Sequence, residues 1–196
     1  MRTLTIFVML FACGCTQTLP ANILIGSNFE QDEADAILSA FDKWEQATGR
    51  EIIIYRGRYI DADYDFWNMI DNYHVVYKAE SPTPATEFFN DWARMKDERD
   101  SDIAGFGMLS DIIIYWYTWG EDFDIDTETE HYDVIRAYFL WRLEDLVMHE
   151  IGHFLGLGHN DDPDSIMNIH HERHWPEPNY ISDRDVDDFC HLYDCP

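Results

Sequence analysis

The sequence predicts an α/β domain built around a mixed β-sheet. Short aliphatic and aromatic runs, typical of strands, dominate the first 120 residues, and a single helical pattern interrupts them. A long helical pattern follows in the last third of the chain, and a shorter one closes it. Strands that precede the main helices in this way favour a sheet covered by helices.

The first half of the chain alternates strand and helix patterns. Residues 22–26 and 51–55 are aliphatic runs that predict strands. Between them, apolar residues recur at helical spacing over 31–48, and Gly49 follows as a stop signal. Residues 74–77 predict a third strand.

Two more strands are expected before the long helix. Residues 103–108 and 111–119 are apolar runs, and the short spacer at 109–110 predicts a tight turn between them. The charged stretch at 81–102 is expected to be a loop or to carry a short helix, and 120–131 reads as an acidic loop.

Two helices are expected near the C-terminus. The apolar spacing over 133–155 predicts a long helix. The last element, at 182–193, begins with Ser182, a favourable N-cap residue, and places Asp183 and Asp185 where the helix dipole favours acidic groups.

The charge balance excludes some classes of partner. There are 39 Asp and Glu against 13 Lys and Arg, a formal net charge of −26, so nucleic acid and anionic lipid surfaces are not expected as partners. A solvated acidic face that keeps the protein soluble is a sufficient explanation for most of these carboxylates. The length of 196 residues predicts one domain over 20–196, after a short leader. The protein is expected to be a monomer.

The N-terminus resembles a secretory signal. Arg2 precedes a short apolar run at 4–12, which is too short to span a bilayer as a stable helix. Cys13 and Cys15 each follow a small residue, as in the cleavage box of bacterial lipoproteins. We therefore expect a signal peptide of the lipoprotein type over 1–15, with Cys15 favoured over Cys13 as the lipidated residue. Ordinary secretion stays open; a membrane contact is expected only through this anchor.

Two cysteines remain after the leader. Export implies an oxidising compartment, so Cys190 and Cys195 are candidates for a local disulfide. The short separation leaves open whether the geometry permits the bond.

The segment 149–159, HEIGHFLGLGH, carries the chemistry. His149 and His153 are four residues apart on the predicted helix, so both imidazoles project from one face and can share one zinc ion. Glu150 lies one position round the helix, within reach of a water at the metal. Gly156 permits a left-handed turn that can return His159 as a third ligand. Three protein ligands leave a fourth position for water, as in catalytic zinc sites.

This segment resembles the extended zinc motif of the metzincin peptidases, which a methionine turn follows. Met167, in the run DSIM, is similar to that turn's methionine. The chain most resembles the matrixin-like branch, although the sequence HEIGH also occurs in a bacterial peptidase group of the same clan. The resemblance implies a metzincin-like fold, with 103–108 as an antiparallel edge strand and a closing helix.

The resemblance also implies the function. It implies a zinc endopeptidase that cleaves extracellular proteins or peptides, with Glu150 as general base. The substrate would pair with the edge strand at Ala104, Gly105, Phe106 and Gly107, and residues 168–180 would form the wall on the leaving-group side. Two alternatives are a catalytically silent zinc-stabilised surface binding module and a zinc hydrolase of a non-protein amide.

The sequence departs from its relatives in several places. Ile169 stands where some metzincins place a zinc-binding tyrosine, so no fifth ligand is expected there. A tyrosine-proline pair common in matrixins is absent after Met167. No cysteine-switch propeptide and no histidine-rich structural-zinc loop are recognisable, so latency and specificity are not carried over.

Two acidic runs and one histidine cluster are secondary candidates. Alternating aspartates can supply oxygen ligands to calcium, but solvated loops explain them as well. Loop histidines near the zinc segment could modulate it, although exposed side chains are the simpler account. These residues are Asp122, Asp124 and Asp126, then Asp61, Asp63 and Asp65, and finally His170, His171 and His174.

Overall fold

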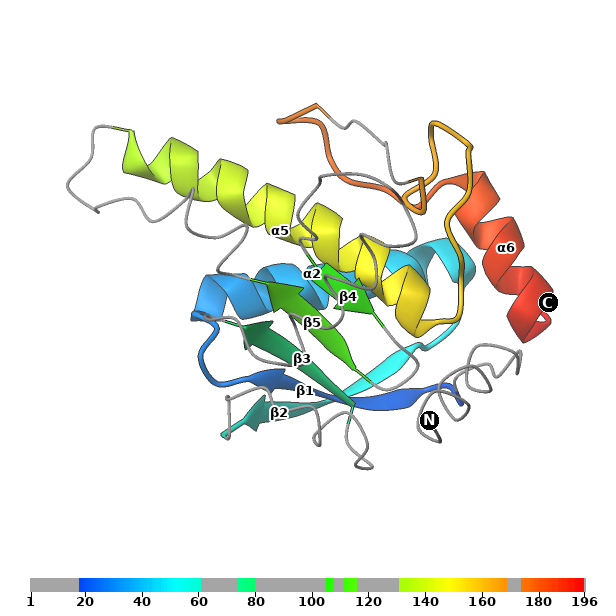
Figure 1. Cartoon of the computed structure of the whole chain (residues 1–196), viewed down its shortest axis with the longest axis horizontal. Helices are drawn as coiled ribbons and strands as arrows, with labels where there is room; N and C mark the ends of the chain where they lie inside the picture. The colour runs from blue at the N-terminus through cyan, green and yellow to red at the C-terminus, as the bar shows by residue number, and fades with distance from the viewer. Residues whose placement is uncertain are drawn as a thin grey trace, which may run out of the picture.

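The computed structural model describes most of the domain. The described residues are 18–60, 74–79, 105–107, 111–115, 131–168 and 174–195. In chain order they form β1 (Ala21–Gly26), α2 (Gln31–Thr48), β2 (Ile53–Tyr59), β3 (His74–Ala79), β4 (Gly105–Gly107), β5 (Ile112–Tyr115), α5 (Tyr132–Phe154) and α6 (Asp183–Tyr193) (Figure 1).

The strands form one mixed sheet in the order β2-β1-β3-β5-β4. The first four run parallel, whereas β4 is antiparallel to β5, with Phe106 opposite Ile113. The mixed α/β fold with an antiparallel edge strand is therefore confirmed. Ala104 and the turn at 109–110 lie outside the described residues.

The helices α2 and α5 run along the same side of this sheet (Figure 1). Alternate residues of β1 and β5, such as Ile23 and Ile114, together with Val76 of β3, belong to one buried cluster with apolar side chains of both helices. Trp44 of α2 is fully buried, and its indole Nε1 donates a 2.9 Å hydrogen bond to the Met148 carbonyl oxygen of α5. The core thereby fixes α5 immediately before the predicted metal ligands.

Two helix boundaries follow their sequence signals. Gly49 has φ 66° and its N–H bonds to the Glu45 carbonyl, so it ends α2 as predicted. Ser182 caps α6 and forms a capping box with Asp185. No helix among the described residues is long and apolar enough to cross a membrane.

The predicted strand 51–55 differs from β2, which begins at Ile53 and continues to Tyr59. The Glu45 carboxylate of α2 accepts the N–H groups of Ile52 and Ile53 at 2.8 and 3.1 Å, which holds the chain before the strand. β2 can include polar residues because it lies at one edge of the described sheet. Its register with β1 shifts beside Gly57, which has φ 108°.

Candidate metal centre

Helix α5 presents two of the predicted ligands. His149 and His153 lie one turn apart, with ring centroids separated by 4.8 Å. Both rings are half-buried, while Val147, Ile151 and Phe154 on other faces are fully buried in the core. Packing of the apolar faces therefore fixes the direction in which the two imidazoles point.

A Schellman motif ends this helix. The N–H of Gly156 bonds to the His153 carbonyl at 2.9 Å, and that of Leu157 bonds to the Gly152 carbonyl at 2.8 Å. Gly156 has φ 89°, in the left-handed region that glycine adopts readily. The turn reverses the chain, as predicted, and brings His159 back to the helix.

The three histidines converge on one point. The Nε2 atom of His159 lies 3.2 Å from that of His149 and 3.1 Å from that of His153. Nitrogens that share a tetrahedral zinc at about 2.0–2.1 Å lie about 3.3 Å from one another. The spacing therefore suits a metal ion, and these three histidines can bind one.

The hydrogen bonds of the rings orient their ligand atoms. His149 Nδ1 lies 2.7 Å from the Ile166 carbonyl oxygen, and His153 Nδ1 lies 2.9 Å from that of Leu157. A carbonyl only accepts, so each Nδ1 carries a proton, and in the neutral form of either ring the lone pair of Nε2 points toward the shared point. Converging lone pairs repel one another, so a cation at that point completes the arrangement.

Burial also affects the protonation of the His153 imidazole. It lowers the pKa of this imidazole, although the hydrogen bond to Leu157 opposes the change. The neutral form that a metal requires is thereby favoured.

Met167 packs directly against the metal-binding helix. Its side chain is buried, and a Cβ built on Gly152 would lie 2.1 Å from the Met167 sulfur. Gly152, between the two helical histidines, therefore leaves the space that the methionine occupies. Sequence reasoning missed this role, although a glycine inside a strong helical pattern is a signal for close packing.

Asp185 of α6 holds the methionine turn. Its fully buried carboxylate accepts hydrogen bonds from Ser165 Oγ and, at 3.0 Å, from the N–H of Ile166. Because the carbonyl of Ile166 binds His149, Asp185 lies two hydrogen bonds from a ligand ring. Sequence reasoning placed Asp185 only in a helical first turn, and no sequence signal pairs it with residue 166.

The remaining predicted residues fall into three groups. Glu150 is buried on α5, directly after the first ligand. Gly105 and Gly107 lie on β4, the edge strand. The predicted calcium aspartates, the lipidation cysteines and Ile169, His170 and His171 lie outside the described residues, whereas His174 is exposed.

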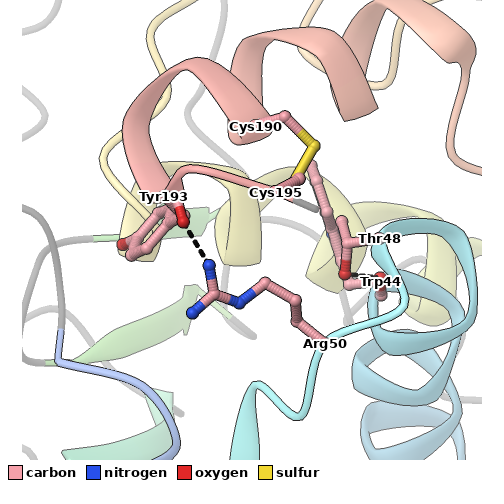
Figure 2. Close-up of a disulfide and its surroundings, with 6 residues drawn as sticks. All are labelled: Trp44, Thr48, Arg50, Cys190, Tyr193 and Cys195. Atoms are coloured by element: carbon pink, nitrogen blue, oxygen red, sulfur yellow. Dashed lines mark hydrogen bonds between the residues drawn. A yellow bond between two sulfur atoms is a disulfide. The ribbon is translucent and has the colours of Figure 1, made fainter.

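The structure contains the Cys190–Cys195 disulfide, with an S–S distance of 2.08 Å. Figure 2 shows it at the C-terminal end of α6, near Thr48, the last residue of α2, and Arg50, which follows that helix. It joins residue 195 to α6 and contributes no atom to the metal centre.

Comparison with known proteins places this geometry in a family. The family model of the matrixin peptidases matches residues 25–194. An archaemetzincin from Methanopyrus kandleri has a similar fold, with a TM-score of 0.51 and 10% sequence identity over 89% of this chain and 95% of that one. No curated protein matches. The family match confirms the resemblance drawn from the zinc segment and the methionine turn. The chain belongs to the matrixin family and is a zinc metallopeptidase.

Proposed function

We propose that the protein is an endopeptidase that cleaves extracellular proteins or peptides, with His149, His153 and His159 as the zinc ligands. The convergence of the three histidines, with one ring nitrogen of each within 4.8 Å of the others, carries this proposal. Three protein ligands leave a fourth coordination position, which is typical of catalytic rather than structural zinc.

The chemistry divides between the metal and one carboxylate. Zinc bound in such a site lowers the pKa of water toward neutrality and polarises a carbonyl group. Glu150 is the proposed general base, which takes a proton from the attacking water and donates it to the leaving amine. Its buried position one residue after His149 supports this role, because a carboxylate there cannot drift into bulk solvent.

The edge strand suggests how a polypeptide would bind. β4 is antiparallel to β5 and ends the order of the described sheet, beside α5 (Figure 1). An extended substrate can add to such an edge through main-chain hydrogen bonds. Gly105 and Gly107 carry no side chain that would hinder its approach. Binding along a strand favours cleavage within a chain over removal of single terminal residues.

The proposed location is outside the cytoplasm. The apolar run at 4–12 and the two cysteines after it support export, with a lipid on Cys15 or Cys13, or free secretion. The mass of the mature N-terminal peptide from a bacterial host would distinguish these outcomes. An unprocessed N-terminus on cytoplasmic protein would contradict the proposal.

Peptide cleavage by the mature protein tests the central proposal. The wild type, Glu150→Gln and the exposed control Glu51→Gln are incubated with a mixed peptide library, with and without a chelator. Chelator-sensitive cleavage within peptides by the wild type and the control, lost in Glu150→Gln while zinc stays bound, is the expected result. Zinc binding without cleavage would favour a silent binding module, and turnover of non-peptide amides alone would favour a different hydrolase.

A further inference from the structure

The helix that carries the ligands ends at a carbonyl that another element must satisfy. The last carbonyl groups of an α-helix have no partner within the helix, and a buried one is costly if it stays without a donor. Leu155 caps α5 and is fully buried. The Tyr193 hydroxyl, at the end of α6, donates a 2.9 Å hydrogen bond to the Leu155 carbonyl oxygen.

Three contacts hold Tyr193 in place. The disulfide joins Cys190 and Cys195 on either side of it, and the Arg50 guanidinium donates a hydrogen bond to its carbonyl oxygen (Figure 2). Its ring stacks on the buried Phe189, with centroids 4.5 Å apart and planes inclined by 21°. The hydroxyl therefore meets α5 from a fixed direction.

The carbonyl that receives this bond lies at the turn that builds the metal centre. Gly156 follows Leu155, and the carbonyl of Leu157, two residues after Leu155, accepts the Nδ1 proton of His153. The same turn leads to His159. A shift at Leu155 would therefore move both the orienting carbonyl of one ligand and the path of another.

We propose that Tyr193, held by the Cys190–Cys195 disulfide, is a positioning residue for the metal centre. It acts through the Leu155 carbonyl and touches neither metal nor substrate. This inference rests on the proposed zinc site. It assigns the disulfide a role in metal retention in addition to closing the C-terminus.

Zinc affinity tests the inference without any need for activity. Competition with a chromophoric chelator measures the Kd of the full mature chain, of Tyr193→Phe, and of the double variant Cys190→Ser/Cys195→Ser. Tyr193→Phe keeps the stacked ring and loses only the hydroxyl. Its Kd should rise by up to about tenfold, the lower end for groups that hydrogen-bond a metal ligand directly, because Tyr193 acts one step further out through Leu155. The double cysteine variant should change the Kd in the same direction. Adding Tyr193→Phe to it should produce less than the summed effect, because both act on one connection.

Tyr55→Phe is the matched control, since Tyr55 is exposed on β2 and should leave the Kd unchanged. A wild-type Kd in Tyr193→Phe would overturn the inference, even if the melting temperature of the metal-free protein fell, because that pattern indicates a structural role alone. Should the double cysteine variant not fold, Tyr193→Phe still decides. Failure of the wild type to bind zinc would count against the proposed function instead.

Discussion

Gly152 shows how one missing methyl group can decide the geometry of a metal centre. In an exposed helix interior, alanine is more favourable than glycine by about 1 kcal/mol. At Gly152 the new Cβ would lie 2.1 Å from the Met167 sulfur, which is itself buried. The methionine would have to move, and the neighbouring Ile166 carbonyl orients His149. The motif therefore needs glycine here for packing rather than for backbone freedom.

Alanine substitutions at three glycines of the motif should therefore have different effects. Gly152→Ala is expected to lower stability by about 1 kcal/mol, since overpacking costs about 1–3 kcal/mol and helix propensity returns part of it. It should also raise the zinc Kd about tenfold. Gly156→Ala should lower stability by about 1–2 kcal/mol, because its φ is 89°. Chemical unfolding and zinc competition measure both quantities.

Gly158→Ala is the matched control of this series. A Cβ at Gly158 would meet no atom within 4 Å, so stability and zinc affinity should both stay near those of the wild type. Equal losses at Gly152 and Gly158 would show that the Met167 contact is not the cause.

Between elements, buried and partly exposed charges connect the helices to the site. Asp185 joins α6 to the methionine turn, and Arg136 of α5 contacts the N-terminal turn of α2 through Glu30, Asp32 and Glu33. The first connection is fully buried and uses one carboxylate for several donors. The second is partly exposed, so solvent weakens it. Their loss should therefore differ in size.

Asp185→Asn should disrupt the methionine turn. The carboxylate accepts from Ile166 N–H, from Ser165 Oγ and from the N–H and hydroxyl of Ser182, and an amide cannot accept from all of these donors. We expect a loss of about 3 kcal/mol, typical for hydrogen bonds to a charged group, and weaker zinc binding. Urea unfolding of the metal-free protein and zinc competition check the two effects. Asp183→Asn, at the exposed start of the same helix, should change neither.

Arg136→Gln should lower stability in a pH-dependent way. The Arg136 guanidinium holds the pKa of Asp32 below its usual value, so this interaction stabilises the fold above the pKa of the unfolded carboxyl, near 3.8. The contribution is lost as the pH falls through the lower, folded value. We expect a loss of about 1 kcal/mol at pH 7 in urea unfolding, the upper range for partly exposed pairs. The difference from wild type should shrink below about pH 4.

Arg184→Gln controls for the loss of one positive charge from a strongly acidic chain. Arg184 is more exposed and pairs with Asp188 on its own helix. Its substitution should leave the free energy of unfolding unchanged at both pH 7 and pH 3. A loss at Arg136 that stayed constant from pH 7 to pH 3 would point to packing on Phe139 rather than to the ion pairs.

At the scale of the whole molecule, local sequence patterns predict one part of the site, and contacts between distant segments determine the rest. The strands, the long helix, Gly156 and the histidine spacing were predictable because local pattern determines them. The Glu45 carboxylate accepts the N–H of Ile52, beyond the end of α2, and so delays the start of β2. The periodicity of the sequence does not reveal this contact. The roles of Ile166, Asp185 and Tyr193 depend on packing of segments 17 to 38 residues from their partners.

Since separate segments converge on one point, zinc should stabilise the whole domain. The proposed ligands come from the end of α5 and from the turn after it, and the carbonyls that orient two of them come from that turn and from residue 166. The unfolded chain does not bring these groups together, so metal binding favours the folded state. At a free zinc concentration about a thousand times the Kd, the gain is about 4 kcal/mol.

Thermal unfolding with and without a chelator should reveal this gain. Removal of zinc is expected to lower the melting temperature of the wild type by about 10 °C or more, since 1 kcal/mol corresponds to about 2–4 °C or more in a domain of this size. His153→Ala should lose most of the zinc-dependent increment, because it removes one of three ligands. His191→Ala removes an exposed histidine of α6 and should keep the full increment. An increment that survived in His153→Ala would place the stabilising metal elsewhere, whereas its loss in that variant alone would assign the stabilisation to the three-histidine centre.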